Sequence, residues 1–244
     1  MPFLILTYLV QVFCAVHALR RGHPIMLVFM ILAFPFLGCL IYLFLVLIPE
    51  WSNSRTAMKT KSAVRGALDP GRELREAAKA LEVSDTVGNR LRMADELAAK
   101  GDAASAVPLY EGCLEGVYAD SPEIMLKLAQ AHFDAGDFAA AKDTLEGLIE
   151  QNPDYRSDEG HLLYARALEG AGEADKALRE YAAVSGYYSG PQARCHYGLL
   201  LEKLGRDQQA RQQFQMVVEG ARHVTAKLRE RHKDWLNLAE SRLR

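Results

Sequence analysis

The pattern of apolar and charged positions divides the chain at about residue 50. Between residues 1 and 50, the only acidic or basic side chains apart from histidine are Arg20, Arg21 and Glu50. Charged side chains are frequent in the remainder of the chain. We therefore expect a short lipid-compatible N-terminal module, followed by a larger region that tolerates water on its surface.

Two uncharged stretches predict membrane-spanning helices over about residues 3–19 and 25–48. The second stretch has 24 residues without a charge. At about 1.5 Å per residue it exceeds the roughly 30 Å hydrocarbon core of a bilayer, and membrane helices tolerate interruptions such as Pro35 and Gly38. Because no Lys or Arg precedes the first apolar run, a cleavable signal peptide is not expected. Residues 1–50 are thus predicted to form a two-helix transmembrane hairpin.

The first of these stretches carries a mildly polar stripe at helical spacing. It consists of Thr7, Gln11 and Cys14, with His17 or Ala18 completing it. We expect this face to pack against the second helix, since small and polar residues mediate helix contacts in lipid. The alternative is that Gln11 and His17 form a lipid-headgroup or proton-handling site, because intramembrane polar groups are costly to keep.

A set of positions within the hairpin also suggests a family. The positions are His17, Arg21-Gly22-His23-Pro24, Phe34-Pro35, Gly38, Tyr42 and Pro49. On these residues the segment resembles the short N-terminal membrane module of bacterial cardiolipin synthases and related phospholipase-D-type proteins. The resemblance implies an anchor and not the enzyme. His232-Lys233-Asp234 does not supply phospholipase-D chemistry, because adjacent residues on a helix point about 100° apart.

The remainder of the chain contains an internal repeat. Four glycines stand 35, 36 and 33 residues apart, namely Gly101, Gly136, Gly172 and Gly205. Seven residues before each glycine stands a small residue: Ala94, Ala129, Ala165 and Gly198. Five residues after each stands an alanine: Ala106, Ala141, Ala177 and Ala210. Nine residues after each stands a large side chain: Tyr110, Leu145, Tyr181 and Phe214.

This spacing predicts pairs of antiparallel helices. Small residues allow two helices to approach closely, and the bulky residue fills the next turn. The glycine suits the left-handed end of the first helix, and Asp102, Asp137 and Glu173 suit the positive end of the second. Over residues 87–220 the pattern resembles the tetratricopeptide repeat. We therefore expect an all-α chain, in which an α-solenoid of about four helix pairs follows the hairpin.

Helices that cover the two ends of the repeats are also expected. Residues 51–68 are predicted to form a basic linker. Residues 69–86 are predicted to form the N-terminal capping segment. Asp69-Pro70 marks the start of its helix, which is expected to end at about Val83. Ser84-Asp85 is predicted to cap the next helix. Residues 221–244 predict one basic amphipathic helix, because terminal repeats need a covered inner face. Its buried stripe would consist of Leu228, Trp235, Leu238 and Leu243.

The resemblance to tetratricopeptide repeats implies a concave groove lined by the first helix of each pair. The predicted groove residues are Leu91, Asp95, Leu126, Gln130, Leu162, Arg166, Cys195 and Leu199. An apolar floor with an acidic rim would suit a partner segment with basic and apolar side chains. The rim residues are Asp95, Glu123, Asp134 and Glu159. The alternative is that these carboxylates form only a solvated face.

Composition excludes several other classes of protein. A net charge of −2 does not favour nucleic-acid binding. The four cysteines show no disulfide or metal spacing, and the histidines are scattered over different repeats. We therefore expect no enzyme, no cofactor and no metal site. Tyr187 and Tyr188 lie in a connection rich in Ser and Gly, where they either pack between repeats or form an exposed aromatic contact.

Together these features predict a membrane-anchored scaffold or adaptor that binds protein partners in its groove and membrane lipid through residues 1–50. The alternative is a non-catalytic accessory subunit or regulator of a lipid-synthesis or envelope enzyme, recognised through the hairpin. Two membrane helices place the N-terminus and the repeats on one side. The basic residues after the second helix favour the cytoplasmic face of a bacterial inner membrane, where anionic lipid would hold the linker.

Overall fold

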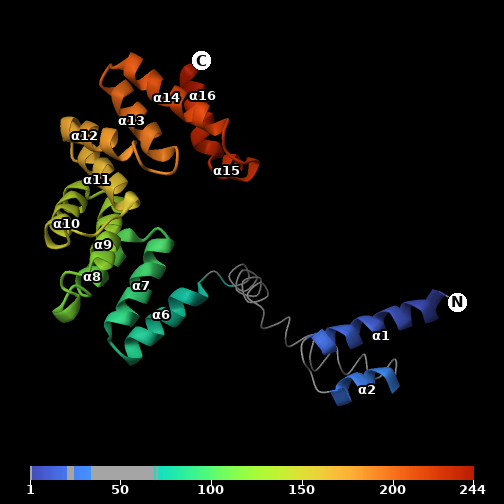
Figure 1. The fold of residues 1–244 in the computed structure, drawn as a ribbon. Helices are drawn as coiled ribbons and strands as arrows, with labels where there is room; N and C mark the ends of the chain where they lie inside the picture. Colours follow the sequence, from blue (N-terminus) through green and yellow to red (C-terminus); the bar gives the residue numbers. More distant parts are fainter. Residues whose placement is uncertain (1, 21–24, 34–68, 70) are drawn as a thin grey trace. The chain divides into compact units, whose positions relative to one another are not determined.

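The structure, a computed structural model, describes residues 2–20, 25–33, 69 and 71–244. It divides into two compact units, Met1–Arg72 and Glu73–Arg244. Within the described ranges every regular element is a helix (Figure 1). The all-helical prediction is therefore confirmed for this part of the chain.

In the described residues of the first unit, α1 (Pro2–Arg20) and α2 (Ile25–Ala33) pack against each other. Their shared core consists of Cys14, Ala15, Ala18, Val28 and Ile31. Gln11 is buried, and its Nε2 donates to the carbonyl oxygens of Ile31 at 3.0 Å and Leu32 at 3.1 Å. The expected packing of the polar stripe against the second helix is thus confirmed at Gln11 and Cys14.

The transmembrane prediction is not confirmed. No helix in the described part of the chain is both long and apolar enough to cross a membrane. With 19 residues, α1 rises about 28 Å, slightly less than the roughly 30 Å hydrocarbon core. The second predicted span is described only as far as Ala33. Its remainder and the predicted linker over residues 51–68 lie outside the described residues.

The second unit is a succession of helices joined by short turns (Figure 1). Its elements are α6 (Arg72–Val83), α7 (Val87–Ala99), α8 (Ala103–Glu111), the 3₁₀ helix η2 (Gly116–Tyr118), α9 (Pro122–Asp134), α10 (Phe138–Gln151), α11 (Asp158–Gly170), α12 (Ala174–Val184), α13 (Gln192–Lys203), α14 (Asp207–Ala221), α15 (Ala226–Arg231) and α16 (Lys233–Leu243). From α7 to α14 each helix packs against the next. The four predicted helix pairs are therefore α7–α8, α9–α10, α11–α12 and α13–α14.

Each pair turns at the predicted glycine. Gly101 has a φ of 82°, and the equivalent glycines of the other three pairs have φ values of 85°, 84° and 72°. This left-handed conformation suits glycine because a side chain would meet the backbone. The N–H of Asp102 then donates to the carbonyl of Leu97 at 3.0 Å, which satisfies one of the free carbonyls at the end of α7.

The residue after each glycine begins the second helix of the pair. Asp102 and Asp137 are N-caps, and the carboxylate of each accepts from the backbone N–H three residues later, at 3.2 and 3.0 Å. Glu173 makes no such cap. Its carboxylate instead pairs with Lys176 at 2.5 Å and Lys142 at 3.0 Å, and both lysines hold the pKa of Glu173 below its usual range.

The repeated small and large residues form the core, as the spacing predicts. Ala94, Ala129 and Ala165 are fully buried, and Gly198 lies against the ring of Phe214. A Cβ placed on Gly198 would come within 2.7 Å of that ring, so the fourth pair needs glycine where the others have alanine. The four large residues are also buried: Tyr110, Leu145, Tyr181 and Phe214.

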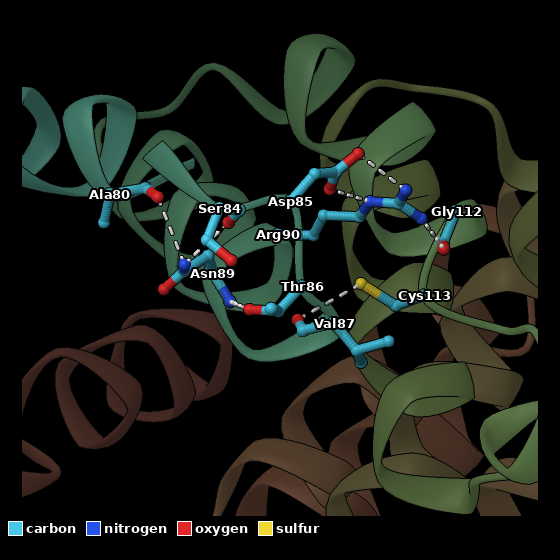
Figure 2. A network of polar contacts seen from close by, with 9 residues as sticks. All are labelled: Ala80, Ser84, Asp85, Thr86, Val87, Asn89, Arg90, Gly112 and Cys113. Atoms are coloured by element: carbon cyan, nitrogen blue, oxygen red, sulfur yellow. Dashed lines mark hydrogen bonds and ion pairs between the residues drawn. The ribbon is translucent and has the colours of Figure 1, made fainter. Parts of the chain in front are cut away.

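The N-terminal capping helix, α6, is tied to α7 by polar contacts (Figure 2). The side-chain amide of Asn89 donates to the carbonyl oxygens of Ala80 at 3.1 Å and Ser84 at 2.8 Å. These bonds add a second donor to each carbonyl, which also accepts a backbone N–H, of Ser84 at 3.0 Å and of Thr86 at 3.1 Å respectively. The cap of α7 differs from the predicted Ser84-Asp85. It is Thr86, whose hydroxyl accepts from the N–H of Asn89 at 3.3 Å.

Asp85 has a different role, which it shares with Arg90. The Arg90 guanidinium binds both oxygens of Asp85, at 2.5 and 2.8 Å, and also donates to the carbonyl oxygen of Gly112 at 2.6 Å (Figure 2). Gly112 is the C-cap of α8. One arginine therefore links the α6–α7 turn to the end of the first helix pair, with the nearby Cys113 thiol facing the carbonyl of Val87 at 3.7 Å.

The C-terminal cover consists of two helices, where one was predicted. The helix breaks at His232, the residue between α15 and α16. The break lets α16 lie against α13 and α14, whereas α15 contacts mainly α16. Trp235 packs against the core next to His196, with 5.0 Å between the ring centroids, as expected for a core residue. The fully buried position of this helix is Ala239, which the predicted stripe did not include.

Candidate functional site

The eight predicted groove residues lie on α7, α9, α11 and α13, two on each helix. Six of them are at least partly exposed. Leu162 and Cys195 are buried, with exposed fractions of 6% and 0%. Both belong to the largest core cluster, and the Cys195 thiol faces the carbonyl oxygen of Trp235 at 3.6 Å. The exposed row is therefore interrupted on α11 and α13.

The first part of this row joins two repeats through Asp95. Its carboxylate on α7 accepts from the Tyr110 hydroxyl of α8 at 2.7 Å and from Lys127 Nζ of α9 at 2.7 and 2.6 Å. Burial and then the Asp95 carboxylate raise the pKa of Tyr110. Asp95 is thus already satisfied within the chain, so the free charge on the predicted acidic rim is smaller than the sequence suggested.

The second part of the row joins the next two repeats. Gln130 is exposed and donates to Asp134 one turn later at 2.8 Å. The Arg166 guanidinium of α11 lies 4.3 Å from the centroid of the Phe133 ring of α9, a cation–π contact. The exposed face of the first helices thus combines apolar side chains, an amide, a guanidinium and carboxylates.

Beneath this row, polar side chains are held in the core by specific partners. The Tyr181 hydroxyl donates to Glu169 at 2.8 Å. His196 lies between two aromatic rings, stacked on Tyr181 and tilted by 59° from Trp235. Burial, with a smaller contribution from the Arg166 charge, lowers the pKa of His196 to about 4. His196 is therefore neutral near pH 7. Within the described ranges, no group of His, Cys, Asp and Glu side chains could hold a metal ion.

The structure also contains a cavity that the sequence did not predict. It has a volume of about 630 Å³ and lies between the second and third helix pairs. Leu126 of α9, Leu148 and Ile149 of α10 and Tyr155 of the following connection give it an apolar floor. Of the predicted groove residues, only Leu126 lines it. No repeated position in the sequence indicates the cavity, because the residues that line it come from four helices and two connections.

A short hydrogen-bonded chain forms one wall of this cavity. His161 Nε2 lies 2.8 Å from Glu180, and His161 Nδ1 contacts the Tyr187 hydroxyl. Tyr187 keeps an exposed fraction of 51%, whereas the Tyr188 hydroxyl donates to Glu159 at 2.8 Å and its ring packs against the core. Both expectations for this tyrosine pair hold in part, since one ring packs and the other is exposed.

The comparisons with known proteins agree with this architecture. Four helix pairs that turn at left-handed glycines define a helical-repeat protein of the solenoid class. Residues 97–158 and residues 162–223 each match a family described as tetratricopeptide repeat. The repeat region of this chain therefore belongs to the tetratricopeptide-repeat family. No curated protein matches the sequence.

Solved structures with this fold share little sequence with the chain. The MamA protein of Desulfovibrio magneticus RS-1, from residue 41 to its end, is 17% identical, and the match covers 68% of this chain and 92% of that one, with a TM-score of 0.58. A thermophilic TPR protein of Thermus thermophilus is 19% identical over 74% of this chain and 96% of that one, with a TM-score of 0.51. At these identities the likeness supports the fold alone.

Proposed function

We propose that the protein is a non-catalytic scaffold or adaptor that binds a protein partner on the exposed face of its first helices. The observation that carries this proposal is the row of partly exposed side chains on α7, α9, α11 and α13, supported by the tetratricopeptide-repeat assignment. A row of this kind presents apolar contacts and hydrogen-bonding groups side by side, as extended or helical peptides require.

The partner segment would carry both basic and apolar side chains. Glu123 and Asp134 are exposed on α9, and Leu126 lies between them on the same face. Complementary charge would orient the partner and raise the rate of association, while burial of apolar surface would supply most of the affinity. Asp95 already pairs with the charge of Lys127, whereas Glu123 and Asp134 accept from the neutral groups of Ser121 and Gln130. Glu123 and Asp134 are therefore better candidates than Asp95 for charge pairing with a partner.

Site-specific photo-crosslinking tests this proposal. A photoreactive amino acid at Gln130, in the full chain expressed in its native host, is expected to capture partners that the same group at Asp143 of α10 does not. Glu123→Lys with Asp134→Lys should reduce that capture, because the charge of the surface is reversed. Glu111→Lys with Asp143→Lys is the matched control on second helices. Equal capture by both double variants would contradict groove binding.

We further propose that residues 1–50 anchor the protein to a bacterial inner membrane, with the repeats on the cytoplasmic side. The support is the uncharged sequence from residue 25 to residue 48, together with the mutual packing of α1 and α2. Fractionation of cells in carbonate buffer tests the anchoring. Alkaline phosphatase fused after Arg244 tests the side, because phosphatase activity requires export and strong activity would overturn a cytoplasmic repeat region.

In the alternative function, the protein is an accessory subunit that its partners recognise through residues 1–50. Partner binding would then depend on these residues and not on the repeats. Partners would survive deletion of residues 87–220 and would be lost when residues 1–50 are replaced by an unrelated anchor. The scaffold proposal predicts loss of partners in the first case and retention in the second.

A further inference from the structure

The cavity between the second and third helix pairs has the dimensions of a binding site. Its volume of about 630 Å³ falls within the roughly 300–1,000 Å³ that is typical of ligand pockets and exceeds the volume of one apolar side chain. Gly160 lies on the lining where α11 packs closely, because a Cβ there would lie 3.2 Å from Ser157 and 3.3 Å from Leu126.

The floor of the cavity is apolar and accessible. Leu126 and Leu148 form its base, and Ile149 at its edge has an exposed fraction of 53%. An exposed isoleucine on α10 is costly to leave in water, at about 25 cal/mol for each Å² of apolar surface. A partner side chain that covered Ile149 would recover part of that free energy.

Most polar groups around this floor already have partners. The His161 imidazole uses both nitrogens, toward Glu180 and Tyr187, and the Tyr164 hydroxyl donates to Glu146 at 3.0 Å. The Arg156 guanidinium donates to backbone carbonyl oxygens, of Pro153 at 2.7 Å and of Tyr155 at 3.3 Å. These groups are therefore fixed in position and contribute shape more than free hydrogen-bonding capacity.

Asp158 is different, because its carboxylate is exposed and makes no hydrogen bond or ion pair with any described residue. It does not serve as the cap of α11, since Ser157 Oγ accepts the N–H of Gly160 at 3.0 Å. Together with Glu180, which also lines the cavity, Asp158 gives the lining two carboxylates against the single guanidinium of Arg156. An apolar floor beside a free carboxylate is complementary to an apolar side chain that is followed by a basic one.

We propose that this cavity binds an apolar side chain of a partner peptide, Leu or Phe in size, whose neighbouring Lys or Arg pairs with Asp158. The inference rests on the proposed protein-binding function, but it assigns a second contact point that shares only Leu126 with the predicted groove. A partner that occupied both would be bound at two linked positions on adjacent repeats.

The test uses the full-length isotope-labelled protein and three blocked hexapeptides. The first is acetyl-Gly-Gly-Phe-Arg-Gly-Gly-amide; the second replaces Phe by Ser, and the third replaces Arg by Glu. The first is expected to shift the backbone amide signals of Ile149, residues 157–161 and Tyr187, and the second is expected to shift none of them. The third should bind at least about two- to fivefold more weakly, because it loses one exposed ion pair and places a second carboxylate beside Asp158.

Two pairs of variants separate the contributions of charge and of apolar surface. Asp158→Asn should lower affinity for the Arg peptide about two- to fivefold and should not lower affinity for the Glu peptide, because the substitution removes a repulsion there. Asp175→Asn, at the equivalent first turn of α12 and outside the cavity, is its control. Ile149→Ser should weaken the Arg and Glu peptides alike, whereas Val117→Ser, at an exposed site on η2, should weaken neither.

Several outcomes would overturn the inference. Shifts confined to Gln130, Asp134 and Leu199 would place the peptide in the groove, so that the proposed function stands and the cavity proposal fails. Shifts in the cavity that do not depend on Arg would indicate a site for any apolar molecule. Shifts of the same amides on raising protein concentration alone would identify a second copy of the chain as the occupant. If Asp158→Asn and Ile149→Ser change peptide binding and Glu123→Lys with Asp134→Lys does not, the cavity proposal stands and the groove proposal fails.

Discussion

At the scale of single residues, two kinds of glycine constrain this chain for different reasons. Gly136 and its equivalents have positive φ and open space around them, so only the backbone conformation selects glycine. Gly198 lies against an aromatic ring, so the side-chain contact selects it. In the sequence, the first kind recurs at the same position of every repeat. The second kind stands at a position where the other three repeats have alanine.

Substitution of glycine by alanine should therefore have opposite effects on the free energy of unfolding at two positions in one helix pair. Gly136→Ala is expected to lower the free energy of unfolding by about 1 kcal/mol, because Ala at a φ of 85° is strained. Gly147→Ala, inside α10 with its nearest contact at 3.7 Å, should raise it by about 0.5–1 kcal/mol. Urea denaturation of both variants measures the difference, and equal effects would contradict the explanation.

The neutral state of His196 predicts a specific pH dependence. In the unfolded chain its pKa returns to about 6.5, whereas in the folded chain it is about 4. The unfolded state therefore binds more protons between these values. The contribution of His196 to stability is complete above about pH 6.5 and falls as the pH drops towards 4, by at most about 3 kcal/mol.

A conservative variant isolates this contribution from that of other histidines. His196→Phe keeps a ring between Tyr181 and Trp235 and cannot be protonated. The denaturation midpoint of this variant should decrease less between pH 7 and pH 4.5 than that of the wild type. Parallel pH profiles for the two proteins would show that His196 does not titrate as expected.

The structural role of a residue could be predicted from the sequence where the same residue type recurs at one position of every repeat. The turn glycines, the buried alanines and the large residues all follow one spacing, so their roles could be assigned before the structure. Leu162 and Cys195 share that spacing with exposed residues of the other repeats, yet they are buried. Their burial depends on neighbouring helices, which a repeat spacing does not specify.

At the scale of elements, α6 is held mainly by side chains of α7. Asn89 binds the carbonyls of Ala80 and Ser84, and Arg92 pairs with Glu73 at 3.3 Å and with Glu76 at 3.7 Å. Only Ala77 of α6 is fully buried. A helix with so little buried apolar surface depends on its end contacts more than an inner helix does.

Asn89→Ala should therefore loosen α6 selectively. The variant removes one of two donors from each carbonyl, because Ala80 still accepts from the N–H of Ser84 and Ser84 still accepts from the N–H of Thr86. The expected cost is about 1 kcal/mol. Hydrogen exchange of the amides of α6 should accelerate, with those of α11 to α14 unchanged. Gln213→Ala on α14, which removes only a contact at 3.4 Å, is the control. Uniform acceleration across all helices would contradict a local role.

Element types were predicted better than element ends. All four helix pairs appear where the spacing placed them, because the glycines and acidic caps mark each turn. The break at His232 was missed, since nothing in the residues around it distinguishes a turn from a continuing amphipathic helix. The cavity was missed for a similar reason, as its lining is set by how α10, α11 and α12 pack.

At the scale of the whole repeat unit, the core is divided among separate clusters. One contains Ala94 and Tyr110, a second contains Ala129 and Leu145, and the largest is built around Tyr181. Because each helix packs chiefly against its sequence neighbours, stability is expected to be distributed along the solenoid. Parts of such a chain also open separately before the chain as a whole unfolds, and hydrogen exchange measures these local openings.

Cavity-forming substitutions at the two ends should show this independence. Tyr110→Ala and Phe214→Ala each remove a buried ring, at a cost of about 3–5 kcal/mol. The first should expose the amides of α7 and α8 to hydrogen exchange and spare α13 and α14, and the second should do the reverse. If each variant accelerated exchange in all helices equally, the repeat unit would be a single cooperative body.

The two buried cysteines of the repeat unit supply natural chemical probes of these openings. Cys113 lies under the first helix pair and Cys195 lies under Trp235, and burial raises the pKa of both thiols, that of Cys195 to about 12. Neither reacts as a thiolate while covered. With Cys14 and Cys39 replaced by serine, the alkylation rate at each thiol reports how often its own end of the solenoid opens, without any label being introduced.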